Sequence, residues 1–462
     1  MNTSSWQLNH DSLLKYIKEV IEILAKYSWI YNVRNTHVLV ENVLEKIPTE
    51  WNEVLMHLNW EELKQLPFGF IKDDWPASLK SFITDCYRLS EIRFSGQNVS
   101  SFIKGECKVH QYIEKKTPKK KQEEIKTLSF LINEICDNTK CNTVIDVGSG
   151  LGYLSETLHY NYGLQCIGLD SLPHHVKEAK VRRKNDLCIS SLHYETMTVK
   201  NTDDCVRKIR DVLNEAGSKQ CGYISKNHDI VKSAEFVKLN SIAMIGLHCC
   251  GNLTQDMMKL FCHMSELKAF VCVGCCYNKI SLDEFPMSQA TKNAVCEIKN
   301  VYPNWSPCTS GLRLGSERTR SDLSIFTPES LFYKQKCLMF RAVLECYIQQ
   351  ENINWHRPKR RIKLQNNADF REYCTAAFAG SEQGENELQL KKLTEMYLER
   401  ECLYPQIRIL LMLQLILQPL WEVFVTIDRL LYFQENSIRA EVFTLWNDLD
   451  SPRNLALCGY KI

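Results

Sequence analysis

Apolar residues recur at helical spacing through the first hundred residues of the chain. Leu13, Ile17, Val20, Ile21 and Leu24 follow one another at the steps that place side chains on one face of a helix. The same period runs from Asp11 to about Phe94, so the sequence predicts a small helical domain. The polar segment from Ser95 to Thr117 is expected to be a linker.

The next part of the chain alternates short apolar runs with helical stretches. A helix is predicted from about Pro118 to Asp137, with the proline where a missing N–H group is tolerated. Five apolar runs predict buried strands: Thr143–Val147, Cys166–Asp170, Ile189–Tyr194, Ile242–Leu247 and Ala269–Val273. The helix-like Thr254–Met264 separates the last two, and the polar Thr196–Lys238 is interpreted as a partly ordered insertion. This alternation predicts an α/β fold with a mostly parallel sheet and helices on both faces.

The pattern becomes helical again beyond Tyr277, over Ser330–Gln350 and Glu387–Gln434. The chain then shows two short strand patterns, Arg439–Leu445 and Asn454–Tyr460, joined by a turn-rich segment. Because unpaired backbone groups in a core are costly, we expect this hairpin to complete the sheet. The predicted domains are a helical N-terminal domain and linker (1–117), a core (118–278), a mainly helical insertion (279–435) and the hairpin (436–462).

Composition narrows the class of protein. The 462 residues are 44% hydrophobic and 24% charged, which is ordinary for a globular chain. The uncharged run Ile409–Trp421 is shorter than the roughly 18 to 20 residues that span a bilayer, so it is interpreted as a buried core helix. The N-terminus lacks a basic and then apolar leader, so the 21 cysteines are expected to be reduced and the protein intracellular, cytoplasmic or nuclear.

One glycine-rich turn carries the main chemical signal. The strand Val144–Val147 runs into Gly148, Gly150 and Gly152, and the next strand ends at Asp170. Glycines let a backbone approach a ligand, and a carboxylate at this spacing can accept both hydroxyls of a ribose. Asp146 before the turn favours a cationic amino-acid group over a pyrophosphate, which indicates S-adenosylmethionine rather than NAD. The alternative is a tight turn without a ligand.

Two unusual clusters are predicted to lie at the carboxyl edge of the same sheet. His248-Cys-Cys-Gly251 follows the fourth strand and Gly274-Cys-Cys-Tyr277 the fifth. A sheet of this kind binds ligands beyond the carboxyl ends of its strands. The candidate catalytic residues are therefore His248, Cys275, Cys276 and Tyr277.

Four interpretations of these clusters stay open. In the first, Tyr277 stacks on a planar base while His248 serves as hydrogen-bond partner or general base. In the second, a cysteine thiolate adds covalently to a base. In the third, the His and Cys side chains bind zinc, although the spacing differs from paired C-x-x-C, and in the fourth the cysteines are small buried apolar residues. We predict no metal in the leading interpretation.

Basic runs are the candidate contacts for phosphates. The net charge is only +2, so affinity for nucleic acid must come from local patches. The first run contains Lys115, Lys116, Lys119, Lys120 and Lys121, and the second contains Arg360 and Arg361. Each run also fits a nuclear import signal or a solvated linker.

Several of these segments resemble the methyltransferase-like protein 25 family. The matching pieces are Trp51–Pro76, Val144–Gly152, Gly246–Leu253, Val273–Tyr277, Asp428–Tyr432 within Leu410–Phe433, and Ser451–Asn454. Where the family has a Lys-Lys-x-His-Glu run, this chain has Lys120 to Glu124, with Glu123 in place of the histidine.

The resemblance implies a class I methyltransferase fold that uses S-adenosylmethionine. It also implies a relation to RNA methyltransferases, including rRNA adenine dimethylases. Those adenine enzymes have an Asn-Pro-Pro-Tyr type motif where this chain has His-Cys-Cys-Gly, which disfavours N6-adenine chemistry. The leading hypothesis is therefore an RNA methyltransferase. One alternative is a methyltransferase that acts on a protein or a small molecule. The other is a catalytically silent scaffold of the same fold.

Overall fold

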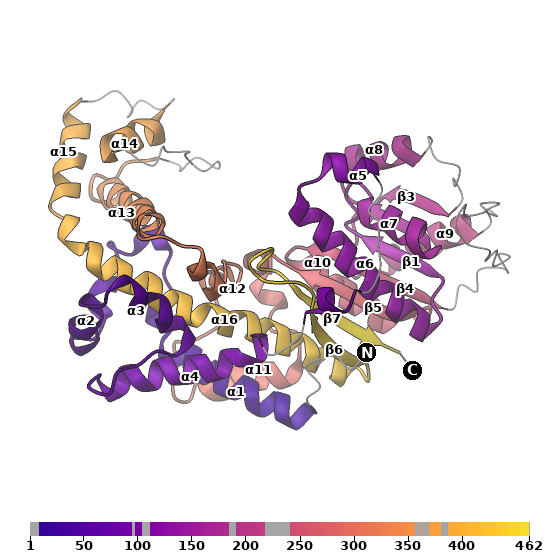
Figure 1. Ribbon diagram of the computed structural model, residues 1–462, viewed down its shortest axis with the longest axis horizontal. Helices are drawn as coiled ribbons and strands as arrows, with labels where there is room; N and C mark the ends of the chain where they lie inside the picture. Colours follow the sequence, from indigo (N-terminus) through magenta and orange to yellow (C-terminus); the bar gives the residue numbers. More distant parts are fainter. Residues whose placement is uncertain are drawn as a thin grey trace. The chain divides into compact units, whose positions relative to one another are not determined.

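The computed structural model describes residues 9–94, 98–103, 111–183, 191–217, 241–355, 362, 369–379 and 387–461. The chain forms two compact units (Figure 1). The first contains Met1–Glu22, Glu91–Glu317 and Glu422–Ile462, and the second contains Ile23–Ser90 and Arg318–Trp421.

A seven-stranded sheet forms the centre of the first unit. Its order is β3-β2-β1-β4-β5-β7-β6. The strands are β1 (Thr143–Val147), β2 (Gln165–Asp170), β3 (Leu192–Thr196), β4 (Ile242–Cys249), β5 (Leu267–Gly274), β6 (Arg439–Thr444) and β7 (Leu455–Tyr460). The first five are mutually parallel, whereas β7 runs antiparallel to both β5 and β6. This order confirms the predicted α/β sheet and its completion by the C-terminal hairpin.

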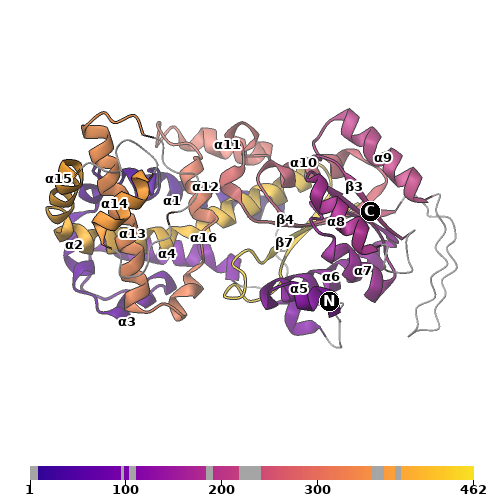
Figure 2. The same ribbon diagram turned by 90° about the horizontal axis from the view of Figure 1, so that it is seen from above.

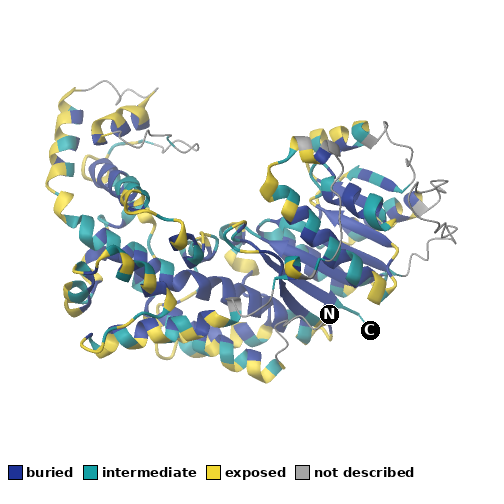
Figure 3. Cartoon of the chain, in the orientation of Figure 1, coloured by how far each residue is buried: buried dark blue, intermediate teal, exposed yellow. Residues whose placement is uncertain are grey.

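Helices cover both faces of the sheet (Figure 2). The complete helices of the first unit are α5 (Gln111–Lys116), α6 (Lys119–Thr139), α7 (Tyr153–Tyr162), α8 (Pro173–Arg183), α9 (Asp203–Gly217), α10 (Asn252–His263), α11 (Gln289–Ile298) and α12 (Thr309–Gly315). Leu128 of α6 and Leu158 of α7 pack with Val271 of β5 in one apolar cluster. Phe270, the next residue of β5 back along the chain, contacts Phe261 of α10. Because neighbouring side chains of a strand point to opposite faces, both layers are apolar where they meet the sheet, and the strands are the most buried part of the unit (Figure 3).

The predicted boundaries of β1, β2, β4 and β5 agree with the structure to within two residues at each end. The prediction for β1 matches both ends. The third strand begins and ends later than predicted, and residues 184–190 lie outside the described part. Within the predicted insertion Thr196–Lys238, α9 occupies Asp203–Gly217, and residues 218–240 also lie outside the described part.

The second unit is helical. Its complete helices are α2 (Thr49–Met56), α3 (Trp60–Gln65), α13 (Pro328–Gln350), α14 (Phe370–Phe378) and α15 (Glu387–Leu398), and α1 (His10–Lys26), α4 (Ala77–Phe94) and α16 (Tyr404–Glu435) contribute part of their length. The buried guanidinium of Arg320 donates to the carbonyl of Pro67 at 3.0 Å and to Ser90 Oγ at 3.1 Å. These bonds tie the early and late segments of the unit together. Each compact unit combines pieces of several of the four predicted domain ranges. The ranges themselves stay a prediction.

One helical stretch among the described residues, Glu401–Glu435, has the length and apolar composition that could cross a membrane. In this structure 89% of its most apolar window is buried inside the protein. The predicted core helix Ile409–Trp421 lies within this stretch, and Leu410, Leu413 and Leu417 are fully buried. Length and composition alone are weak support for a membrane span here.

Truncation after Tyr432 should abolish the cooperative melt of the first unit. The truncation removes β7, whose Leu457 lies opposite Cys272 of β5, and so exposes a sheet edge together with buried apolar area worth about 25 cal/mol per Å². Thermal unfolding followed by circular dichroism measures this. Arg439→Ala, at the exposed start of β6, is the control and should change stability by less than about 1 kcal/mol. A truncated protein that still melts cooperatively would show that the sheet does not need the hairpin.

Candidate active site

The glycine turn lies where the strand order reverses. β1 pairs with β2 on one side and β4 on the other, and open α/β sheets bind ligands at such a point. Gly148, Gly150 and Gly152 have φ angles of +72°, +55° and +78°, a left-handed region that favours glycine. The N–H groups of Gly148 and Ser149 both donate to the carbonyl of Leu169, at 2.8 and 3.1 Å. The turn is therefore fixed to the end of β2.

The space around the three glycines differs in a way that suits a ligand. A Cβ atom at Gly152 would lie 2.5 Å from Tyr194 Oη, so this position has no room for a side chain. A Cβ atom at Gly150 would meet nothing within 4 Å, and at Gly148 only Leu253 at 3.7 Å. The turn thus packs tightly at its helical end and is open beside Gly148 and Gly150, where a ligand can approach the backbone.

Asp170 stands beside this open part of the turn, as predicted. Its Oδ2 accepts a hydrogen bond from the Gly150 N–H at 2.9 Å, and its Oδ1 accepts one from the Leu172 N–H at 2.9 Å. His175 Nδ1 lies 3.2 Å from Oδ1. A carboxylate oxygen can accept more than one hydrogen bond, so Asp170 keeps acceptor capacity for hydroxyl groups. Its assignment to a ribose stays a prediction.

Asp146 is buried beneath the turn. Ser155 Oγ donates to Asp146 Oδ2 at 2.7 Å. Burial raises the pKa of Asp146 to about 6; the Ser155 hydrogen bond and the charge of Lys121 oppose the rise, and Asp170 adds to it. The carboxyl group is thus poised to change charge near neutral pH, which a cationic ligand group would influence strongly.

A β-bulge turns His248 out of the sheet. The pairing of β4 with β5 passes from Leu247–Val273 to Cys249–Gly274, which leaves His248 without a partner residue. His248 has a φ of +64°, an uncommon angle for a residue with a side chain. Bulges of this kind re-aim side chains next to active sites. Here the local strain places the imidazole beside α6.

Glu124 of α6 receives that imidazole, and the sequence did not single it out. Its Oε2 lies 3.0 Å from His248 Nε2, and the carboxyl group is buried. Burial raises the pKa of Glu124, but the hydrogen bond and charge of His248 outweigh it, with Ser451 and Lys120 also lowering it, so the net pKa is lowered. In the sequence, Glu124 is the last residue of the run that corresponds to the family's Lys-Lys-x-His-Glu, and this match could have pointed to it. Glu123, which replaces the family's histidine, is exposed.

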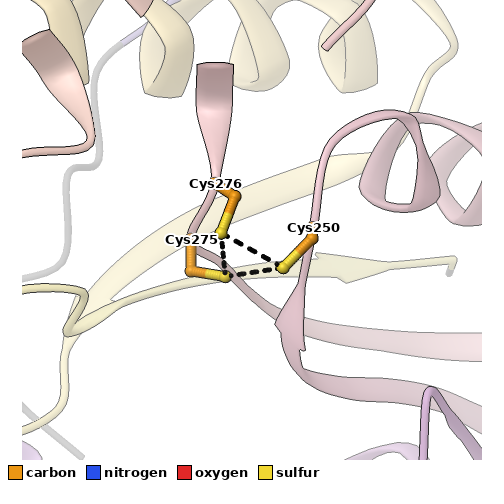
Figure 4. A group of neighbouring side chains, drawn as sticks. All are labelled: Cys250, Cys275 and Cys276. Carbon is orange, nitrogen blue, oxygen red and sulfur yellow. Dashed lines mark hydrogen bonds between the residues drawn. The ribbon is translucent and has the colours of Figure 1, made fainter. Parts of the chain in front are cut away.

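The predicted cysteines that follow β5 meet a third cysteine, which follows β4. Figure 4 shows Cys250, Cys275 and Cys276 pointing toward one another. Their Sγ atoms are 3.1 Å (Cys250–Cys275), 3.3 Å (Cys250–Cys276) and 3.5 Å (Cys275–Cys276) apart. A hydrogen bond with Cys275 lowers the pKa of Cys250 against the effect of its burial. Cys249 instead points into the core, so the two neighbouring cysteines have different environments.

Tyr277 requires a correction of the expected stacking geometry. The residue begins the short turn η6 (Tyr277–Lys279) and is buried, with 4% of its surface exposed. Its hydroxyl donates to Glu422 Oε1 at 3.2 Å, and the guanidinium groups of Arg429 and Arg453 lie 5.5 and 5.9 Å from its ring. The ring offers no open face to a planar substrate, because these buried charged groups already surround it. The hydrogen bond to Glu422 instead anchors the loop after β5 to α16.

Two further residues that sequence reasoning assigned no role anchor the same loop region. Asp428 accepts hydrogen bonds from the N–H groups of Met287 and Ser288, at 2.8 and 3.0 Å. Arg453 donates to Glu422 Oε1 at 2.8 Å and to the carbonyl of Gly315. Both belong to segments that carry the family resemblance, and both hold chain that follows β5.

The first basic run spans the end of α5 and the start of α6. Lys116, Lys119 and Lys120 are exposed, and Lys120 Nζ is 4.0 Å from Glu124 Oε1. Lys121 is close enough to lower the pKa of Asp146. Lys115 belongs to α5, but its side chain lies outside the described part of the structure. Arg360 and Arg361 lie outside the described residues altogether. The structure thus places part of one predicted phosphate-binding run next to the site.

Comparison with known proteins agrees with this geometry. Residues 120–283 match the family described as "Methyltransferase domain". "Probable methyltransferase-like protein 25" of Homo sapiens is 23% identical over 464 residues, which cover 74% of this chain and 74% of the human protein. Its Mus musculus counterpart is 24% identical over 249 residues, or 51% of this chain and 39% of the mouse protein.

A solved structure was also compared. Coclaurine N-methyltransferase bound to N-methylheliamine and SAH is 8% identical, with 98% of this chain and 93% of that chain covered and a TM-score of 0.20. The domain match runs from α6 to the loop after β5, a segment that contains the glycine turn, His248 and the three cysteines. The chain is thus similar to the methyltransferase-like protein 25 proteins and is built around a class I methyltransferase domain.

Proposed function

We propose that this protein is an S-adenosylmethionine-dependent methyltransferase that acts on RNA. The observation that supports the cofactor most strongly is the open glycine turn at the reversal of strand order, with Asp170 hydrogen-bonded to Gly150 at 2.9 Å. The turn leaves room for a ligand against the backbone, and the carboxylate beside it has acceptor capacity left.

The residues present fit the cofactor. Asp170 would accept the ribose hydroxyls, and Asp146 would balance the ammonium of the amino-acid part. Gly148 and Gly150 would face the ligand where a side chain would fill the space. When bound, S-adenosylmethionine supplies an electrophilic methyl group.

His248 and Glu124 are suited to proton transfer from the substrate. Methyl transfer to an N–H or O–H group of the substrate releases a proton, so the reaction needs a side chain that accepts it. When the Nε2–H group of His248 donates to Glu124, its Nδ1 is left as the acceptor. Glu124 then holds the tautomer and the ring orientation, and His248 takes the proton.

The support for RNA is the charge at the start of α6. Lys119 and Lys120 are exposed about one helical turn before Glu124, which contacts His248, and the exposed Lys116 lies just upstream at the end of α5. Flexible cations in this position would contact the phosphates of a strand whose base or ribose reaches the site. Protein and small-molecule substrates do not need such a run.

Replacing Asp170 by Ala should lower the affinity for S-adenosylhomocysteine by at least tenfold. The change removes hydrogen bonds to a charged group, each worth about 1.5 to 3 kcal/mol. Isothermal titration calorimetry gives the affinity, and a thermal melt checks that the variant is folded. Asp211→Ala, an exposed carboxylate on α9, is the matched control and should bind like the wild type. Equal affinities in both variants would remove Asp170 from the cofactor site.

The affinity for S-adenosylhomocysteine should fall with decreasing pH because of Asp146. Burial raises the pKa of Asp146 to about 6, so the carboxylate is ionised above that pH and neutral below it. Only the ionised form attracts the ligand ammonium, so affinity should be level above about pH 7 and fall roughly tenfold per unit well below pH 6. Calorimetry with Asp146→Asn provides the comparison: its affinity should be low and lack this dependence. A variant with the wild-type pH profile would assign the dependence to another group.

Methyl transfer should label RNA and depend on the lysines of α6. Extract from cells that lack the protein is separated into RNA, protein and small-molecule fractions, and each is incubated with the protein and a tritiated methyl donor. Lys119→Glu and Lys120→Glu should each lower kcat/KM on RNA and reduce its salt dependence by about one phosphate contact.

The matched control combines Lys292→Glu with Lys299→Glu. Lys292 is exposed on α11 and Lys299 is exposed just after it, so both quantities should stay unchanged. Label in the protein or small-molecule fraction alone would reject RNA and retain the methyltransferase. Cofactor binding without transfer to any fraction would instead establish a silent scaffold.

A further inference from the structure

We infer that Cys250, Cys275 and Cys276 form a binding site for a zinc ion. The inference concerns metal binding and does not depend on the methyl-transfer reaction proposed above. Among the residues that the structure describes, these three form the group of potential metal ligands whose donor atoms converge, all within 4.8 Å of one another. Each cysteine is partly exposed, so an ion can reach the sulfur atoms.

The distances suit a tetrahedral thiolate site. With Zn–S bonds of about 2.3 Å, neighbouring sulfur ligands lie roughly 3.8 Å apart. The three Sγ atoms are 3.1, 3.3 and 3.5 Å apart. They would need to separate by about 0.3 to 0.7 Å, which rotation about the side-chain bonds can provide. The soft donor set favours zinc over magnesium or calcium, which prefer oxygen.

The two loops that supply the sulfurs are held against each other. Gly251 follows Cys250 with a φ of +59°, and a Cβ atom there would lie 2.7 Å from the carbonyl oxygen of Lys279. Asn252 Oδ1 accepts a hydrogen bond from the N–H of Ser281 at 2.8 Å. The backbone therefore brings the ligands together before any ion binds, as a metal site requires.

The fourth position of the ion would be open. Three protein ligands with one free position are typical of zinc sites that bind water or a substrate atom, whereas structural sites are closed by four. His248, two residues before Cys250, makes its hydrogen bond to Glu124 and lies outside the converging group. The site is thus distinct from the His248–Glu124 pair, although both follow β4.

Metal analysis of the full chain tests this site. The protein is purified under reducing conditions without chelators, and zinc per chain is measured by mass spectrometry of the metal. We expect about one zinc per chain in the wild type, and at least a tenfold loss of affinity in Cys250→Ser, Cys275→Ser and Cys276→Ser. Cys262→Ser and Cys296→Ser, cysteines of the same unit outside the group, should retain the metal.

A second measurement uses the wild-type protein, so it does not depend on the folding of a variant. Zinc should protect the three cysteines from alkylation, mapped on peptides, while the exposed Cys296 stays reactive. Cobalt(II) added to the metal-free protein should give sulfur-to-cobalt charge-transfer absorption. Full alkylation of the three thiols in the presence of zinc would overturn the site. A disulfide between Cys250 and either partner in reduced preparations, or zinc binding in the three variants equal to that of Cys296→Ser, would overturn it as well.

Discussion

The backbone hydrogen bonds that join β4 to β1 on one side and to β5 on the other determine where the chemistry of this protein lies. Parallel strands end at one edge of their sheet, so the loops after these three strands are forced together although they lie far apart in sequence. The glycine turn, the bulged His248 and the three thiols are therefore neighbours through sheet geometry. No single loop could bring these groups together.

The sequence indicated the sheet and the cofactor turn well because both depend on local rules. A buried parallel strand is a short continuous apolar run, and the turn after β1 needs glycine at positions of positive φ. The roles of Gly148, Gly150 and Gly152 in the turn could therefore be predicted from the local sequence alone. The hairpin also followed from the cost of an unpaired edge, since β6 and β7 had no other strand to join.

The substrate side of the site was harder to predict because its contacts are distant in sequence. Glu124 lies in a helix that looked like a basic run, and only the fold places it against His248, which is 124 residues away. Tyr277 was predicted to stack on a planar base, yet Glu422, Arg429 and Arg453 enclose it. Neither periodicity nor spacing reports contacts between side chains so far apart. The convergence of Cys250 with Cys275 and Cys276 depends in addition on which way each side chain points after a bulge.

The position of β7 between β5 and β6 has a consequence for synthesis on the ribosome. β5 ends at Gly274, but the strand that pairs with its outer edge does not begin until Leu455. While the intervening segment is translated, β5 is an apolar strand with unsatisfied backbone groups on one side. Such edges recruit other strands, and pairing across so long an interval is slow. The nascent chain should therefore depend on chaperones from the time β5 leaves the exit tunnel until β7 emerges, and ribosomes stalled within α16 should release an aggregation-prone product.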